Sequence, residues 1–327
     1  MSYLEVFIGL VCLLWGAEVM LRGTVAVASR MGISPLVIGM TVIAFGTSAP
    51  ELVVGVTSAL SGFGAIALGN IVGSNIANIF LILGATGIVA PILVHPRALR
   101  ADATVMLLST LFFAGLSWRA TIGRGAGGIL VAVLIGSLWN AYQREKKGRS
   151  AAAHLHVREA EEYRDVDVNI WAAWGFMVVG LSGVVFGSKL LVDGGVDIAR
   201  TWGVSEAVIG LTLVALGTSL PELATALVAA RRGHGDVALG TVIGSNIFNV
   251  LGVGGISALT HPLGVPEQMR HFDLWVMLAA TFAIYYMLML GRPIGRKISL
   301  LFLLAYGLYI FAQGIGADKI AGWFAGS

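Results

Sequence analysis

The chain contains little charge and a single cysteine, and both shortages exclude classes of protein. Only 12% of its 327 residues are charged and 57% are hydrophobic, with a mean hydropathy of +0.86. A soluble domain has about 25% charged residues, so this composition does not fit one. The lone cysteine, Cys12, allows neither a disulfide framework nor a thiolate metal site. No basic patch is interleaved with aromatic residues, which argues against nucleic acid as a partner.

Several catalytic and metal-binding motifs are missing as well. The sequence has no HExxH motif, and no histidine lies near Ser48 or Ser219 to act as a base. The histidines all fall in predicted loops or at span ends, so ligation of a metal by imidazole is not expected. An intramembrane enzyme is therefore the least favoured class, and no cofactor is expected.

Long apolar runs dominate the sequence. They are about 20 residues long, enough for a helix to cross ~30 Å of hydrocarbon. The first run is too long for the core of a signal peptide and has no basic leader, so we expect a retained helix. The runs predict an all-α integral membrane protein with ten transmembrane helices. The predicted spans are residues 3–22, 35–60, 65–91, 102–118, 123–142, 168–192, 206–230, 237–259, 272–290 and 297–316.

The sequence contains an internal repeat of the kind found in many secondary transporters. The segment GMTVIAFGTSAPELVV at 39–54 recurs as GLTLVALGTSLPELAT at 210–225. The segment LGNIVGSNIANIFLILG at 68–84 recurs as LGTVIGSNIFNVLGVGG at 239–255. One offset of 171 residues relates both pairs without a gap. The chain is therefore predicted to consist of two related halves.

Each half is one predicted five-helix unit, residues 1–143 and 168–327, and a polar, solvated linker at 144–167 joins them. Because five is odd, the second unit enters the membrane from the opposite side, so the repeats are inverted. With a cytoplasmic linker, the inner loops carry about three times as many Lys and Arg residues as the outer loops. The positive-inside rule then predicts a multi-pass protein of the plasma (inner) membrane with both termini outside.

Each repeat places a glutamate deep inside an apolar span. Glu51 lies about one helical turn from the predicted middle of its span, and Glu222 repeats this position. Placing an ionised side chain at this depth costs at least about a few kcal/mol of free energy, and such residues commonly mark an ion pathway. Inverted repeats bring such residues together near the pseudo-twofold axis. The sequence thus predicts a site with two carboxylates at the membrane midplane.

Residues around these glutamates supply further oxygen atoms. Thr47 lies four residues before Glu51, on the same helical face. Pro50 and Pro221 have no N–H group, so each leaves a carbonyl one turn earlier without its helical partner. Ser74 and Asn78 form another pair four residues apart, and their GSN segment favours a second helix break; Ser245 and Asn249 repeat the pair. Oxygen ligands without thiol or imidazole favour Ca²⁺ or Na⁺.

Structural roles compete with ion binding at several of these positions. Ser48-x-x-Glu51 and Ser219-x-x-Glu222 also match the capping box of a helix that restarts after a break. Asn75 and Asn246 are also explained by packing of helices through small residues. The charged residues near span ends have simpler explanations. Glu18 and Lys189 are expected to snorkel, and Asp102 and Asp273 are expected to be N-caps.

At GTSAPE (46–51), GTSLPE (217–222) and the two GSNI-x-N segments, the chain resembles the sodium/calcium exchangers of the cation/calcium exchanger superfamily, in their compact prokaryotic form. The resemblance covers essentially the whole chain. It implies an inverted-repeat fold in which helices two, three, seven and eight enclose the ions, and helices one and six slide. It also implies that both glutamates bind Ca²⁺ and Na⁺. The implied ligands are Glu51, Glu222, the side chains of Thr47, Ser48, Thr218, Ser219, Ser74, Asn78, Ser245 and Asn249, and the carbonyls of Ala44 and Ala215.

The chain departs from parts of this family in two ways. Some relatives, including potassium-dependent exchangers, carry aspartate where this chain has Asn249, which argues for potassium independence. Thr241 stands where the repeat would place the counterpart of Asn70, so the two halves are not equivalent there.

The expected activity is antiport of Na⁺ against Ca²⁺ by alternating access. Two ionised glutamates are balanced by one Ca²⁺ or two Na⁺, and the family suggests a further Na⁺ that makes transport electrogenic and drives Ca²⁺ out. A proton- or potassium-coupled cation exchanger remains the nearest alternative, and a passive cation channel is the alternative from another class. The expected partners are the two ions and the lipid bilayer, and the sequence leaves the oligomeric state open.

Overall fold

The computed structural model describes residues 2–30, 44–92, 96–146, 169–231 and 235–315. Within these ranges the chain is almost entirely helical, which confirms the prediction of an all-α protein. The two short strands β1 (Thr121–Ile122) and β2 (Leu263–Gly264) pair antiparallel. Residues 147–168, which include most of the predicted linker, lie outside the described residues.

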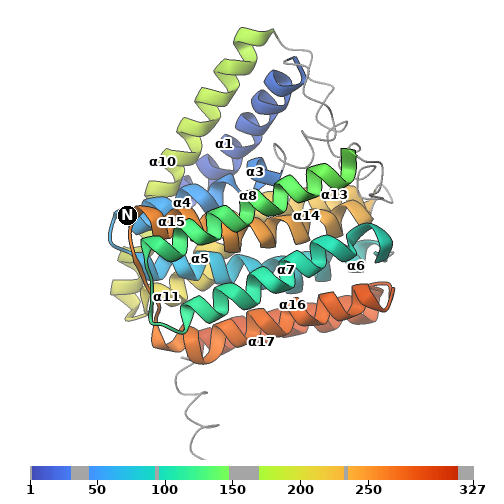
Figure 1. Ribbon diagram of the computed structural model, residues 1–327. Helices are drawn as coiled ribbons and strands as arrows, with labels where there is room; N and C mark the ends of the chain where they lie inside the picture. Colours follow the sequence, from blue (N-terminus) through green and yellow to red (C-terminus); the bar gives the residue numbers. More distant parts are fainter. Residues whose placement is uncertain (1, 31–43, 93–95, 147–168, 232–234, 316–327) are drawn as a thin grey trace, which may run out of the picture.

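The order of the helices along the chain is similar in the two halves; Figure 1 shows where they lie. In the first half they are α1 (Ser2–Arg30), α3 (Ala44–Thr47), α4 (Ala49–Leu60), α5 (Gly64–Ala77), the π-helical turn η2 (Asn78–Ile82), α6 (Leu83–Val89), α7 (Pro96–Ser117) and α8 (Arg124–Lys146). In the second half they are α10 (Ile170–Trp202), α11 (Glu206–Ile209), η3 (Gly210–Val214), α12 (Ala215–Thr218), α13 (Leu220–Arg231), α14 (Gly235–Phe248), η4 (Asn249–Val253), α15 (Gly254–Thr260), η5 (Met269–Asp273), α16 (Leu274–Met289) and α17 (Arg296–Ile315).

Eight helices of the described residues are long and apolar enough to cross a membrane. A ninth candidate is the pair Glu206–Thr218 and Leu220–Arg231, which is bent by 41°. The predicted span 35–60 is described only from Ala44 onward, and its described part contains α3 and the apolar helix α4. The structure therefore confirms a multi-span helical protein.

Two helix runs form the centre of the bundle. An apolar 18-residue stretch within Gly64–Val89 has 89% of its residues buried and one within Ala238–Thr260 has 78%, whereas one within Arg124–Gln143 has only 17%. Apolar side chains of α8 therefore remain exposed on the outside, as expected of a surface that faces lipid. The central runs carry the GSN segments of both repeats, so these segments lie at the core of the protein.

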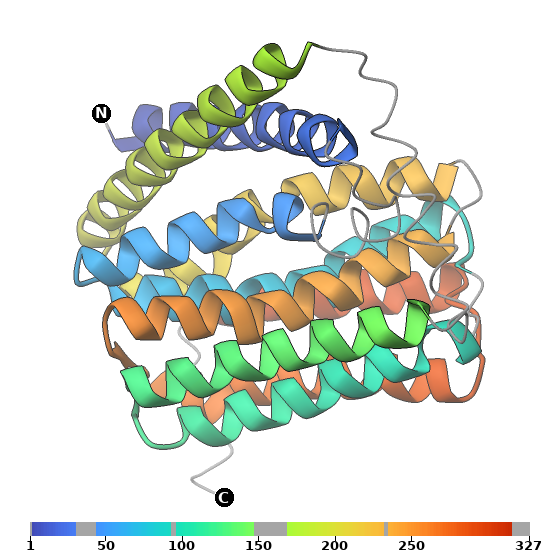
Figure 2. The same cartoon turned by 45° about the horizontal axis from the view of Figure 1, so that its top comes forward.

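Helices α1 and α10 form a long pair along one face of the bundle, at an angle to the other helices (Figures 1 and 2). Glycines spaced seven residues apart let their backbones touch. A Cβ atom on Gly16 would lie 2.7 Å from the carbonyl oxygen of Gly180, and one on Gly187 would lie 2.6 Å from that of Gly9. Contacts that lie later in α1 involve residues that lie earlier in α10, so the two helices are antiparallel. Such close approach is a common use of glycine in membrane helices.

The N-cap predictions for two aspartates are wrong. Asp102 lies inside α7, which begins at Pro96. Asp273 ends the π-helical turn η5 and makes no side-chain capping bond to α16. Its carboxylate instead accepts hydrogen bonds from the Tyr309 hydroxyl at 3.0 Å and from the Gln313 amide at 2.5 Å, both on α17. Asp273 therefore joins two helices, a tertiary role that its local sequence does not reveal.

Candidate ion-binding site

Both glutamates follow a break in a helix. Ser48 separates α3 from α4 with φ −89° and ψ 11°, and Ser219 separates α12 from α13 with φ −84° and ψ 4°. A proline occupies the second position of each restarting helix, where its missing N–H group costs nothing. The two repeats thus adopt nearly the same broken-helix geometry, and each presents its glutamate in the first turn after the break.

Each serine at a helix break forms a hydrogen bond with the glutamate of the other repeat. The Ser48 hydroxyl donates to Glu222 Oε1 at 3.1 Å, and the Ser219 hydroxyl donates to Glu51 Oε1 at 3.3 Å. Thr47 and Thr218 interact with the same carboxylates as their neighbouring serines. Ser48 makes no side-chain capping bond to α4, so the capping-box alternative is wrong at this position.

Each carboxylate keeps one oxygen atom that has no hydrogen-bond partner within the described part of the chain. Glu51 and Glu222 are both fully buried, and the charges of the two groups repel each other. Among the described residues, neither Glu51 Oε2 nor Glu222 Oε2 has a hydrogen-bond partner. Buried charge without compensation is unfavourable. The arrangement is therefore suited to a cation that contacts both carboxylates.

The serines of the central helices lie beside the carboxylates but differ in their bonds. Ser245 donates to Glu222 Oε1 at 3.4 Å, and its hydroxyl oxygen lies 3.2 Å from that of Ser48. Ser74 donates to the Asn70 amide oxygen at 3.4 Å and lies 3.5 Å from the Thr218 hydroxyl. The serine of the central helix therefore donates a hydrogen bond to a glutamate in the second repeat and to an asparagine in the first repeat.

Asn70 is a site residue that the sequence reasoning did not propose. Its amide nitrogen donates to the Glu51 carbonyl at 3.1 Å, and its amide oxygen accepts from the Thr218 hydroxyl at 3.0 Å. It thereby links α4, α5 and α12 while remaining fully buried. The available signal was the break in the repeat, because Thr241 occupies the corresponding position.

The predicted breaks at the GSN segments are not present. Helix α5 continues through Ser74 to Ala77, and the irregularity is a π-helical turn that begins at Asn78 in one repeat and at Asn249 in the other. Turns of this kind are frequent at functional sites. Asn78 Oδ1 and both polar atoms of the Asn249 side chain are buried and have no hydrogen-bond partner among the described residues. These orphaned polar atoms suit a cation or water in the site.

The remaining asparagines of the two motifs have protein partners. Asn75 donates to the Ile71 carbonyl at 2.7 Å, within its own helix, which fits the packing alternative. Asn246 accepts from the Asn78 amide at 3.0 Å and so joins the central helices of the two repeats. Of the residues implied to bind through carbonyls, Ala44 opens α3, and the Ala215 carbonyl accepts from Ser219 N at 3.1 Å.

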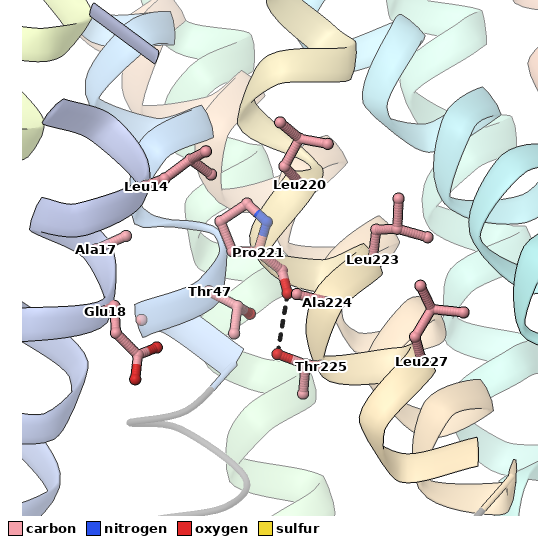
Figure 3. Close-up of a pocket in the computed structure, with 11 residues that line it drawn as sticks. Leu14, Ala17, Glu18, Thr47, Leu220, Pro221, Leu223, Ala224, Thr225 and Leu227 are labelled. Carbon is pink, nitrogen blue, oxygen red and sulfur yellow. Dashed lines mark hydrogen bonds between the residues drawn. The ribbon is translucent and has the colours of Figure 1, made fainter. Parts of the chain in front are cut away.

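A pocket of about 460 Å³ lies next to this site, between α1, α3 and α13 (Figure 3). Thr47 and Pro221 line it, and they directly precede Ser48 and Glu222 in the chain. Glu18 of α1 also lines the pocket and forms an ion pair with Arg22 at 2.6 Å. The pocket thus connects a charged pair on α1 with the edge of the two-carboxylate site.

Comparison with known proteins identifies the family. The family model for the sodium/calcium exchanger protein matches residues 1–143 and 172–314. This chain belongs to the sodium/calcium exchanger family. As a member, the exchanger is a membrane antiporter of calcium and other cations and not an enzyme, which confirms the resemblance that the motifs indicated.

Similarity to individual members extends over nearly the whole exchanger. The chain is 37% identical to the putative antiporter CaxA of Alkalimonas amylolytica, across 92% of this chain and 95% of that protein. It is 30% identical to the sodium/calcium exchanger MaX1 of Methanosarcina acetivorans, across 94% and 97%. A solved structure of the sodium-calcium exchanger NCX_Mj, soaked with 10 mM Na⁺ and 10 mM Sr²⁺, has a TM-score of 0.64 at 32% identity and covers 94% of this chain and 97% of that chain.

Proposed function

We propose that this exchanger is an electrogenic Na⁺/Ca²⁺ antiporter that exports Ca²⁺ and binds both ions at Glu51 and Glu222. The observation that carries the proposal is the crossed pair of hydrogen bonds, in which the serine of each repeat reaches the glutamate of the other. Both carboxylates are thereby held in one buried site, and each retains an oxygen atom for a cation.

Neutral oxygen atoms complete the proposed ligand set. Ca²⁺ takes about 6–8 oxygen ligands, and Na⁺ uses the same kind of atoms. The orphaned side-chain oxygens of Asn78 and Asn249 are candidates, because neither has a protein partner among the described residues. The proposed ligands are Glu51, Glu222, Thr47, Ser48, Thr218, Ser219, Ser74, Asn78, Ser245 and Asn249, with the carbonyls of Ala44 and Ala215.

Charge balance explains why the two ions exchange. Two ionised carboxylates are neutralised by one Ca²⁺ or by two Na⁺. An unloaded site would carry its charge through a low-dielectric interior, which is strongly unfavourable. The site therefore changes the side of the membrane to which it opens only when it holds ions. A further Na⁺ on neutral oxygens would move net charge, and the inward Na⁺ gradient would then drive Ca²⁺ out.

We further propose ten transmembrane helices in two inverted repeats, residues 1–143 and 168–327, with the linker 144–167 in the cytoplasm and both termini outside. In this arrangement α1 and α10 move together across the site, since their backbones are in direct contact through glycines. Their motion would open the site alternately to the two sides of the membrane.

Flux measurements test this proposal. Purified protein is reconstituted into Na⁺-loaded vesicles, and Ca²⁺ uptake is followed after dilution into Na⁺-free buffer. We expect uptake by the wild type and at least about a 100-fold loss in Glu51→Gln and in Glu222→Gln, because each removes one of two charges from a desolvated site. Glu267→Gln makes the same chemical change at a side chain that is 80% exposed, and it should transport normally.

Two outcomes would overturn the proposal. Unchanged flux in either glutamine variant at the site would remove these carboxylates from ion binding. Uptake that follows a pH gradient and ignores Na⁺ would favour the proton-coupled alternative.

A further inference from the structure

Among the described residues that line the pocket beside the site, one carries a charged side chain, Glu18. The other described lining residues are small, apolar or hydroxyl-bearing, and Thr47 and Thr225 provide the hydroxyls. Figure 3 shows Glu18 on α1 and Pro221 on α13, with Thr47 between them. A cation that passes from Glu18 to Thr47 reaches a residue that interacts with Glu222.

Glu18 occupies an unusual position for a charge. It lies within the apolar segment Ser2–Thr24, where an ionised side chain is unfavourable unless it faces a cavity or a partner. The side chain has both, because it lines the pocket and pairs with Arg22 one turn later. The glutamate side chain is 46% exposed and that of arginine is 53% exposed. A pair this exposed contributes only about 0–1 kcal/mol, so an incoming cation can displace the arginine.

The repeat reverses these charges in the other half. The residue that corresponds to Glu18 is Lys189, and the residue that corresponds to Arg22 is Asp193, both on α10. Both α10 residues are exposed. In an inverted repeat the two positions belong to access routes on opposite sides of the membrane. One route therefore has a carboxylate where the other has an ammonium group.

We propose that Glu18 is a cation-recruiting residue at the mouth of a vestibule formed by this pocket, and that Arg22 is the counter-ion which a divalent cation displaces. This inference rests on the proposed function and its orientation, which place the ends of α1 and α13 near Arg30 and Arg231 on the cytoplasmic side. A carboxylate at the mouth raises the local concentration of Ca²⁺ more than that of Na⁺, because the attraction scales with ionic charge. Lys189 has the opposite effect on the outer route.

The test uses inside-out vesicles, which expose the cytoplasmic face to the bath and are loaded with Na⁺. The initial rate of Ca²⁺ uptake is measured against bath Ca²⁺ at about 20 mM and about 300 mM ionic strength, where screening lengths differ severalfold. At low ionic strength we expect Glu18→Gln to raise the KM for Ca²⁺ about 3- to 10-fold with little change in maximal rate. The difference should shrink at high ionic strength, and Glu18→Asp should restore the wild-type KM.

Matched variants separate recruitment from a structural effect. Arg22→Gln should lower the KM at this face, because it removes the competing cation. Lys189→Gln should leave that KM unchanged, and right-side-out vesicles should show no effect of Glu18→Gln on the KM for external Ca²⁺. Rates are normalised to the amount of folded protein in the vesicles.

Three results would overturn the inference. An unchanged KM in Glu18→Gln at low ionic strength, with Na⁺-driven uptake intact, would contradict the recruiting role alone. A loss of maximal rate at constant KM would assign Glu18 a structural role. Absence of Na⁺-driven uptake in the wild type would remove the proposed function and this inference together.

Discussion

Asn70 stands where the two repeats differ, since its counterpart is Thr241. It holds the Glu51 carbonyl and the Thr218 hydroxyl in a fully buried position. Threonine is shorter and has no amide group, so it does not offer the same pair of bonds. The first repeat thus supports its glutamate through an asparagine, whereas the second supports it through Ser245. The proposed ion site is therefore asymmetric in its side chains, although the backbone around it is nearly symmetric.

Replacing Asn70 by alanine tests this asymmetry. Asn70→Ala leaves the Thr218 hydroxyl without its closest partner and should reduce the free energy of unfolding by about 1–3 kcal/mol. We also expect the KM for Ca²⁺ to rise, because the backbone of Glu51 loses its support. Thermal unfolding in detergent and vesicle flux measure the two effects. Asn140→Ala, at an exposed position on α8, should change neither, and equal behaviour of the two variants would contradict the role of Asn70.

At the scale of the elements, the glycines between α1 and α10 determine how closely these helices pack. A Cβ atom at Gly187 would lie 2.6 Å from the Gly9 carbonyl oxygen and 2.7 Å from Leu13 N, so the helices must separate to accept it. A Cβ atom at Gly175, on the same helix, would meet no described atom within 4 Å. The two positions form a matched pair for testing whether tight packing is needed for transport.

We expect Gly187→Ala to lower stability by about 1–3 kcal/mol, as overpacking of a tight interface does. It should also reduce the transport rate, because α1 and α10 would no longer move as one unit. Gly175→Ala should behave like the wild type. Thermal unfolding and flux in vesicles check both expectations. A Gly187→Ala protein that transports at the wild-type rate would show that this contact is not needed for the motion.

Local chemistry accounts for the elements that the sequence could predict. Pro50 and Pro221 cannot continue a helical hydrogen-bond ladder, so the breaks before them follow from residue type alone. The expected GSN breaks are absent because nothing in Gly73-Ser74-Asn75 prevents a buried helix from continuing. The crossed bonds of Ser48 and Ser219, and the link from Asp273 to α17, join residues far apart in the chain. No local pattern contains that information.

At the scale of the whole molecule, the proposed stoichiometry predicts that transport moves charge. With three Na⁺ leaving for each Ca²⁺ that enters, one net positive charge leaves the vesicle per cycle, so an interior made positive by a K⁺ gradient and valinomycin should speed Ca²⁺ uptake into Na⁺-loaded vesicles. An interior made negative should slow it. The measurement is the initial uptake rate at several imposed potentials. A rate independent of potential would indicate electroneutral exchange and contradict the third Na⁺.

The central claim is that Glu51 and Glu222 hold one transported ion in common, and equilibrium binding tests it most directly. Ca²⁺ binding to the purified protein in detergent is measured with and without Na⁺, for the wild type and for Glu51→Gln, Glu222→Gln and the Glu267→Gln control. The account predicts one Ca²⁺ per chain in the wild type and the control, displacement of that Ca²⁺ by Na⁺, and loss of binding in both glutamine variants at the site. Tight Ca²⁺ binding that survives in either of these two variants, or that Na⁺ does not displace, would contradict it.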